Sequence, residues 1–309
     1  MGTAVLEFIE SLAKSGCQAR IVSISRLGEM ERTLSDLKTS GEITPEFYPE
    51  IIKYFKFERS STLANACSII ITASPQLPSR VVFGSDRVII PPTYIHREIR
   101  KNQLDMVKGF LEPRGYKVAR TRLPFKTLAV QSGLARYGRN NVAYIPGMGS
   151  FFRLAAFYSD LPCDKDTWEK PRMLNNCLKC NACEVACPPG CISKSRFLVH
   201  AERCLTHFNE QEGPLPAWIE ASWHNALLGC MACQQVCPLN KKLMEKIEDS
   251  LVKFTDSETR EILAGVSKDS LREETRSKLE SLCLAEDDVY PFLKRNLSLL
   301  LDKTPELPD

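Results

Sequence analysis

Eight cysteines at ligand-like spacing carry the clearest chemical signal in this 309-residue chain. They form two runs, Cys177-x2-Cys180-x2-Cys183-x3-Cys187-Pro188 and Cys230-x2-Cys233-x3-Cys237-Pro238, with Cys204 between them. Thiolate is a soft ligand that suits iron–sulfur centres, and the first run has the spacing found in bacterial ferredoxins. In that arrangement three cysteines of a run bind one [4Fe–4S] cluster and the fourth reaches the other cluster. The spacing therefore predicts two [4Fe–4S] clusters.

The second run lacks a cysteine where the pattern would begin, because that position is Leu227. Cys204 is the replacement that we expect, and Cys191, four residues after Cys187, is the alternative. With Cys204, the predicted ligands are Cys177, Cys180, Cys183 and Cys237 for cluster one, and Cys187, Cys204, Cys230 and Cys233 for cluster two. Two structural zinc sites are a second interpretation, since paired C-x2-C motifs also bind zinc. Zinc does not require the C-x3-C-P endings.

The remaining composition indicates a protein that stays inside the cell. No apolar run reaches the roughly 18–20 residues that a membrane helix needs. Met1–Glu10 has neither the basic nor the long apolar region of a secretory signal. We therefore expect no membrane contact. Thiols in the cytoplasm stay reduced, so we also expect no disulfides. Four scattered cysteines, Cys17, Cys67, Cys163 and Cys283, are expected to be buried or incidental thiols.

The net charge of +3 does not indicate a nucleic-acid-binding protein as a whole. However, the stretch from Pro113 to Ser159 has no acidic residue and eight basic ones: Arg114, Lys117, Arg120, Arg122, Lys126, Arg136, Arg139 and Arg153. Such a segment could hold an anionic group. Alternatively, acidic neighbours in space could balance it.

The first 160 residues alternate between helical and strand-like patterns without strict order, which predicts an α+β fold. Helices are expected at 6–15, 95–111 and 124–134, and strands at 19–24, 68–73, 80–83, 87–90, 116–120, 141–145 and 151–158. The β-branched run at 68–73 is typical of a strand buried on both faces. The predicted domains are an α+β domain at 1–165, a double-cluster domain at 166–240 with its cysteine-containing part from about 176, and a helical cap at 241–309.

Two segments resemble the epoxyqueuosine reductase family. They are the glycine-containing Ser132–Asn141 (SGLARYGRNN) and Gly149–Phe152 (GSFF), which precede the cysteine runs. The lone Cys204 and the ending Gly229–Asn240 (GCMACQQVCPLN) also resemble that family, over roughly residues 60–240. Reductive dehalogenases share the layout. The resemblance implies a nitroreductase-like sheet that holds cobalamin, followed by a ferredoxin-like domain whose clusters reduce it. The corrinoid-facing residues implied are Gly133, Gly138, Arg139, Asn140, Asn141, Gly149, Ser150 and Phe151.

One feature of that family is missing. Its members carry an aspartate, which donates a proton, on the strand before the glycine segment, whereas residues 118–123 here contain no carboxylate. Related dehalogenases use a tyrosine assisted by a basic residue. Tyr137 and Tyr144 are therefore candidates, and a nearby Arg136 or Arg139 would lower the pKa of a phenol. The candidate catalytic residues are Tyr137 and Arg139. The alternative is that Tyr137 only packs in the core or faces solvent.

These observations lead to three hypotheses. The first is a cytoplasmic, cobalamin-dependent iron–sulfur reductase with an undefined substrate and a low-potential electron donor of the ferredoxin or flavodoxin type. The second is an electron-transfer protein that serves a corrinoid or flavin on a partner. The third is a tRNA epoxyqueuosine reductase, which is less favoured because the C-terminal region is short for a tRNA-binding repeat domain.

Overall fold

The structure is a computed structural model that describes residues 3–59, 61–96 and 98–301. It separates into two compact units. Unit 1 comprises Met1–Gln76, Glu98–Asn181 and Ile192–Val199, and unit 2 comprises Leu77–Arg97, Ala182–Cys191 and His200–Asp309. These boundaries differ from the three consecutive domains expected from the sequence, because each unit is assembled from three separate stretches of chain. Positions 97 and 302–309, which fall within expected helical regions, lie outside the described residues.

Unit 1 is built on an antiparallel sheet in the order β1-β2-β8-β5. Its strands are β1 (Gln18–Ser23), β2 (Ser68–Pro75), β8 (Phe152–Ser159) and β5 (Val118–Arg120). Seven of the eight residues of β2 are buried, as the β-branched run predicts for a strand covered on both faces. Between β5 and β8 in the sequence, the short strands β6 (Arg136–Tyr137) and β7 (Ala143–Tyr144) pair with each other. The glycine segment, Ser132–Asn141, includes β6.

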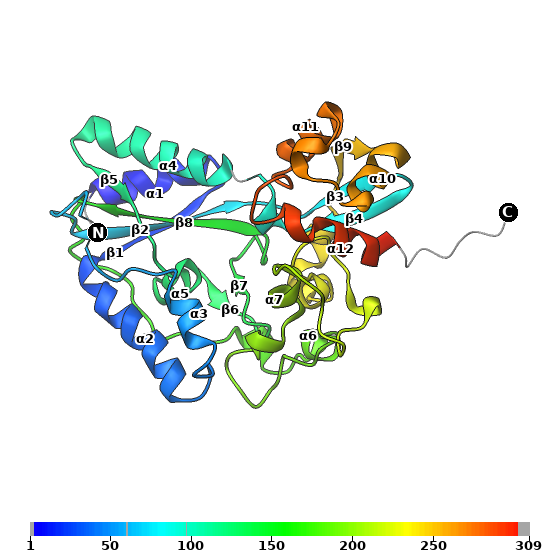
Figure 1. Ribbon diagram of the computed structural model, residues 1–309. Helices are drawn as coiled ribbons and strands as arrows, with labels where there is room; N and C mark the ends of the chain where they lie inside the picture. Colours follow the sequence, from blue (N-terminus) through cyan, green and yellow to red (C-terminus); the bar gives the residue numbers. More distant parts are fainter. Residues whose placement is uncertain (1–2, 60, 97, 302–309) are drawn as a thin grey trace. The chain divides into compact units, whose positions relative to one another are not determined.

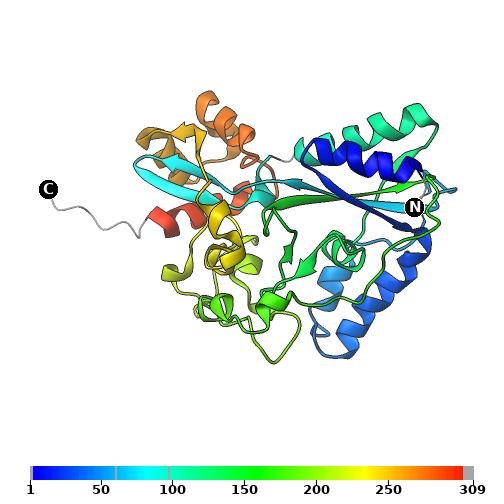
Figure 2. The same cartoon turned by 180° about the vertical axis from the view of Figure 1, so that it is seen from behind.

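Helices cover both faces of this sheet (Figures 1 and 2). On one face are α1 (Thr3–Lys14) and α4 (Glu98–Leu111), whose Phe8 and Val107 pack with Ile70 of β2. On the other face are α2 (Leu27–Thr39), α3 (Tyr48–Ile52) and α5 (Phe125–Gln131). There Met30 of α2 packs with Leu128 of α5 in a second core. The α+β class predicted from the sequence is confirmed.

Unit 2 contains a second sheet, in the order β4-β3-β9. The expected hairpin forms between β3 (Ser79–Phe83) and β4 (Asp86–Ile90), but it belongs to unit 2 and not to the first domain. Its partner β9 (Asp249–Phe254) runs parallel to β3, within the region that was expected to be helical throughout. That expectation is therefore wrong for residues 249–254. Phe83 and Phe254 stack across this pair with ring centroids 4.6 Å apart.

Helices and cysteine-bearing turns complete unit 2. The helices are α6 (Ala182–Val185), α7 (Leu205–Asn209), α8 (Ala232–Gln235), α9 (Lys241–Met244), α10 (Asp256–Ala264), α11 (Glu273–Ser281) and α12 (Tyr290–Leu301). Thr255 caps α10 reciprocally with Glu258, which satisfies backbone N–H groups at the start of that helix. Of the helices in the described residues, none combines the length and the apolar character that crossing a membrane would require.

The parallel β9 gives a stability prediction with a matched control on the same strand. Phe254 is 2% exposed and Leu251 is fully exposed. Phe254→Ala should lower the free energy of unfolding by about 3–5 kcal/mol, because it leaves a cavity beside Phe83. Leu251→Ala should change it by about 0.5 kcal/mol or less. Urea unfolding followed by circular dichroism measures both, and equal effects would show that β9 is not packed as described.

Candidate functional site

The thiols predicted to bind cluster two gather within unit 2. The sulfur of Cys187 lies 3.2 Å from that of Cys191. Cys191 also shares a hydrogen bond with the thiol of Cys204. The charges of Cys187 and Cys204 both act on Cys230. Three of the four predicted ligands of cluster two, Cys187, Cys204 and Cys230, are therefore within electrostatic reach of one another. Cys191, which is not a predicted ligand, lies with them.

This grouping shifts the pKa values of the thiols in opposite directions. The hydrogen bond with Cys191 lowers the pKa of Cys204 to about 6. The pKa of Cys191 is raised by its hydrogen bonds with Cys187 and Cys204, and that of Cys230 is raised by burial. Thiolate is the form that binds iron, and the hydrogen bond with Cys191 favours the thiolate at Cys204.

The turn that carries Cys230 is held by Asn225. The side-chain amide of Asn225 donates to the sulfur of Cys230 at 3.2 Å, and its oxygen accepts the backbone N–H of Met231 at 2.7 Å. N–H groups directed at a ligand sulfur stabilise the thiolate and tune cluster potentials. Cys230 therefore has a hydrogen-bond donor of the kind that supports an iron–sulfur ligand.

In unit 1, the first cysteine turn is fixed by Arg139. The Arg139 side chain is 7% exposed. Its Nε donates to the carbonyl oxygen of Cys180 at 3.0 Å, and its Nη2 donates to that of Cys177. The guanidinium therefore holds the C-x2-C turn by its backbone. This engagement favours a positioning role for Arg139, while the catalytic role expected for it stays a prediction.

The donor set fits two [4Fe–4S] clusters, since the eight predicted cysteines are half-buried free thiols on short turns. Within the described part of the chain, no three His, Cys, Asp or Glu side chains gather as a single metal ion would need. The ligand set of each cluster stays a prediction from the sequence.

Packing within the glycine segment explains why position 138 is a glycine. A Cβ at Gly138 would lie 2.5 Å from Cε2 of Tyr144 and 2.6 Å from Oδ1 of Asn140. The amide of Asn140 donates to the Tyr144 hydroxyl at 3.0 Å, and both side chains are buried. Gly133 has a φ of +76° and faces Thr167. A side chain at Gly138 would therefore disrupt the segment before any ligand is considered.

The other predicted corrinoid-facing residues lie close by in unit 1. Asn141 has a φ of +56° and accepts from Nζ of Lys126 through both its backbone and side-chain oxygens. Gly149 follows a turn closed by its bond to Ile145, and Ser150 and Phe151 are buried. A corrinoid contact at these positions stays a prediction.

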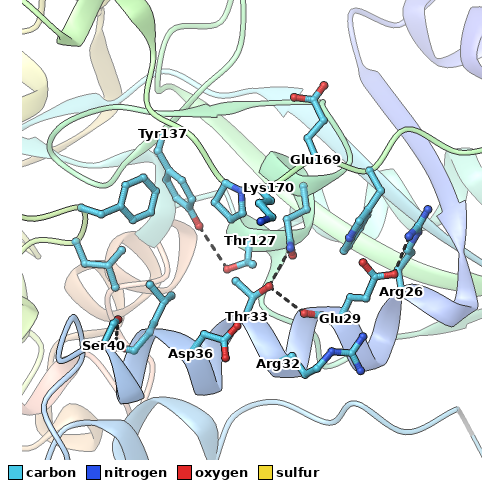
Figure 3. A pocket seen from close by; sticks show the side chains of 16 residues that line it. Arg26, Glu29, Arg32, Thr33, Asp36, Ser40, Thr127, Tyr137, Glu169 and Lys170 are labelled. Atoms are coloured by element: carbon cyan, nitrogen blue, oxygen red, sulfur yellow. Dashed lines mark hydrogen bonds and ion pairs between the residues drawn. The ribbon is translucent and has the colours of Figure 1, made fainter.

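A cavity of about 810 Å³ opens in unit 1 beside this segment (Figure 3). Its aromatic lining is Tyr137, Trp168 and Phe197. The helix α2 and the residues next to it form much of its wall: Arg26, Glu29, Arg32, Thr33, Asp36, Leu37 and Ser40. The volume lies in the range of small-molecule sites, about 300–1,000 Å³.

Tyr137 is the predicted catalytic residue that reaches this cavity. Figure 3 shows its hydroxyl pointing toward Thr127, whose Oγ1 is 3.4 Å away. That distance is long for a hydroxyl pair, so the contact is weak. Burial raises the pKa of Tyr137 to about 12. The expectation that a nearby arginine lowers this pKa is therefore wrong.

The two arginines expected to assist Tyr137 are engaged elsewhere. Arg136 pairs with Glu169 at 3.0 Å, and Arg139 binds the carbonyls described above. Lys126 is the cation nearest the phenol in these contacts, with its Nζ 5.8 Å from the ring centroid. None of the eight basic residues of the 113–159 stretch is among the residues that line the cavity. Arg136 is balanced by an acidic neighbour, as one of the two interpretations of that stretch expected.

Sequence reasoning missed α2 as a wall of the cavity. Leu27, Met30 and Leu34 are buried at helical spacing, a signal that could have placed a helix there. The helix brings Glu29 and Asp36 to the cavity although the glycine segment has no carboxylate of its own. Glu29 is paired with Arg26 at 2.6 Å. The fold thus supplies carboxylates from a distant part of the sequence.

A comparison with protein families identifies the class of the domain that carries the cysteine runs. Residues 176–240 match the family model of the 4Fe–4S double cluster binding domain. This part of the chain is therefore an iron–sulfur domain of the double-cluster type on an α+β protein.

The particular likeness is to epoxyqueuosine reductases. The enzyme of Bacillus subtilis is 28% identical over 153 residues, which are 47% of this chain and 38% of that protein. The enzyme of Aliivibrio fischeri is 28% identical over 189 residues, which are 56% of this chain and 50% of that protein. The matched stretches thus span half or less of these curated relatives.

Solved structures show the same likeness in the fold. The Bacillus subtilis epoxyqueuosine reductase structure superimposes with a TM-score of 0.67 at 22% identity, over 96% of this chain and 80% of that one. The chain is thus similar to epoxyqueuosine reductases in part of its sequence and in its fold, which is the likeness that its glycine segment and cysteine spacing predict.

The contacts of Arg139 give a prediction about cluster one. Arg139→Gln removes two hydrogen bonds from a charged group, each worth about 1.5–3 kcal/mol. The first cysteine turn should loosen, and iron after anaerobic reconstitution should fall from about eight toward about four per chain. Arg120→Gln, an exposed change at the end of β5, is the control and should keep its iron. Iron analysis with electron paramagnetic resonance (EPR) decides, and full iron in Arg139→Gln would contradict the role proposed for the guanidinium.

Proposed function

We propose that this chain is an iron–sulfur reductase that works with cobalamin. In this proposal, the two [4Fe–4S] clusters pass electrons singly to a corrinoid bound by unit 1, which acts on a substrate near Tyr137. The observation that carries the proposal is the large cavity beside the glycine segment, in a chain that also has a double-cluster domain. A cluster domain alone transfers electrons, whereas a cavity of this size offers a place to use them.

The lining of the cavity is compatible with a large, partly apolar ligand. Trp168 and Phe197 offer aromatic surfaces, and Thr33 and Thr127 offer hydroxyl groups. Among the described residues that line it there is neither a histidine nor a cysteine. A corrinoid held there would be bound by these aromatic and hydroxyl groups, since the described lining residues offer neither imidazole nor thiolate. None of the eight corrinoid-facing residues that the family resemblance implies is among the described residues that line the cavity. Their contact with a corrinoid remains a prediction from the resemblance.

When bound and reduced, a corrinoid supplies a nucleophilic metal centre that can break a bond in a substrate. The residues of this chain would bind the substrate and deliver its proton. Tyr137 keeps its proton at neutral pH because burial holds its pKa at about 12. Its weak contact with Thr127 leaves the hydroxyl able to turn toward a bound molecule. Tyr137 is therefore proposed as the proton donor, with a partner of the ferredoxin or flavodoxin type as the electron source.

A second candidate is a tRNA epoxyqueuosine reductase. Its support is that the curated relatives carry that name, and that one solved relative with a TM-score of 0.67 contains an epoxyqueuosine-modified tRNA stem loop. The Bacillus subtilis structure was described with a catalytic aspartate loop, and residues 118–123 here have no carboxylate. Restoration of queuosine in a strain that lacks its own reductase would establish this candidate over the first.

Corrinoid binding is the direct test of the leading proposal. The full chain, reconstituted without oxygen, should bind about one cobalamin and give a base-off absorption spectrum, with about eight irons per chain. Trp168→Ala should weaken binding because it removes an aromatic surface of the cavity, whereas Trp218→Ala, an exposed change in unit 2, should not. Intact clusters without any corrinoid binding would instead indicate an electron-transfer protein that serves a partner.

Replacing Tyr137 tests the proton donor. Tyr137→Phe should lower turnover of an accepted epoxide or aryl halide probe by about 10²–10⁴-fold while cobalamin still binds. Tyr116→Phe, a half-buried change in unit 1, is the control. Because the folded pKa is about 12, the wild-type rate should not fall through loss of this proton below about pH 11. An unchanged rate in Tyr137→Phe would transfer the role to another group, with Asp36 of the cavity wall the first to examine.

The same pKa has a consequence for stability. A tyrosine with a folded pKa raised above its usual value of about 10 binds its proton more tightly in the folded state. Its contribution to the free energy of unfolding is complete below about pH 10 and is lost as the pH rises toward 12.

A further inference from the structure

Four cysteines of unit 2, Cys187, Cys191, Cys204 and Cys230, act on one another. With Cys233, which the sequence also predicts as a ligand, they are one more than a [4Fe–4S] cluster needs. Cys191 lies among the ligands predicted for cluster two, although the ligand pattern does not require it. Its sulfur is 3.2 Å from that of Cys187, and it shares a hydrogen bond with the thiol of Cys204. It is 2% exposed, more buried than the ligands themselves.

The backbone holds Cys191 in this place. Gly190, with a φ of +61°, turns the chain directly after the first cysteine run. The carbonyl of Cys191 then accepts the N–H of His200 at 2.8 Å, which ties it to the segment that leads to Cys204. The two cysteines are therefore brought together by a local, hydrogen-bonded arrangement.

A purely structural role does not account for these neighbours. A buried thiol that only fills space behaves as a small apolar group and packs against apolar side chains. The contacts of Cys191 include two sulfurs that are predicted to bind iron. A thiol at that distance can reach the same iron when a ligand is lost or displaced.

We propose that Cys191 is a reserve ligand of cluster two, able to take the iron that Cys204 binds. In the exchange, a bond forms between iron and the Cys191 sulfur while the bond to the Cys204 sulfur breaks. The proton of the Cys191 thiol passes to Cys204, and no electron is gained or lost. The inference depends only on the double-cluster part of the proposed function, and neither cobalamin nor a substrate enters into it.

The test uses the full chain reconstituted without oxygen, in four variants. They are Cys204→Ala, Cys191→Ala, the double variant, and Cys283→Ala as a control at a scattered half-buried cysteine of unit 2. Each single variant should keep about eight irons and two [4Fe–4S] signals in the EPR spectrum of the reduced protein. Cys204→Ala should show altered signals for one cluster, because one of its sulfurs now comes from a different place in the chain.

The double variant should lose cluster two or retain it only as a three-iron form, seen as a new EPR signal of the oxidised protein. The proposal is overturned if Cys204→Ala alone loses that cluster, if Cys191→Ala alone does so, or if the double variant keeps all eight irons. Zinc or about four irons in the wild-type chain would instead remove the double-cluster assignment itself. The two failures are therefore distinguishable.

Discussion

A guanidinium that is buried away from water must find hydrogen-bond acceptors inside the fold, and this requirement fixes the glycine segment. Arg139 is 7% exposed, and its acceptors are the backbone carbonyls of Cys177 and Cys180. The segment that carries Tyr137 and the turn that carries two predicted ligands are thereby joined within unit 1. Gly138 beside it has no room for a side chain, because Tyr144 and Asn140 occupy that space. A substitution in this segment therefore acts on the cysteine turn as well as on the cavity.

The sulfur group of unit 2 follows a different principle. There the pKa values of the thiols depend on how many thiols lie close together. The hydrogen bond with Cys191 lowers the pKa of Cys204, while burial raises the pKa of Cys230. Asn225 partly offsets that burial by donating to the Cys230 sulfur. The ligands are thus tuned unequally, although the spacing in the sequence treats them alike.

Local patterns predicted local structure well. The β-branched run at 68–73 became the central, fully covered strand, and the hairpin of β3 and β4 formed where Gly84 allows its turn. Two features depend on distant contacts and could not be found in this way. The strand β9 owes its existence to pairing with β3, more than 160 residues earlier in the sequence, and the raised pKa of Tyr137 results from burial that no motif records. The cavity wall from α2 is an intermediate case, since its apolar spacing was present in the sequence.

Charge explains why Tyr137 suits proton donation in this chain better than its surroundings first suggest. A phenol beside a free arginine would lose its proton more easily and would serve better as a base. Here Arg136 is paired with Glu169 and Arg139 with backbone carbonyls, so neither cation is directed at the phenol. Burial raises the pKa of Tyr137 more than the hydrogen bond with Thr127 lowers it, so the phenol stays neutral. A site without a carboxylate on its glycine segment can in this way still present a protonated phenol to the cavity, which is the basis of the proton-donor role proposed for Tyr137.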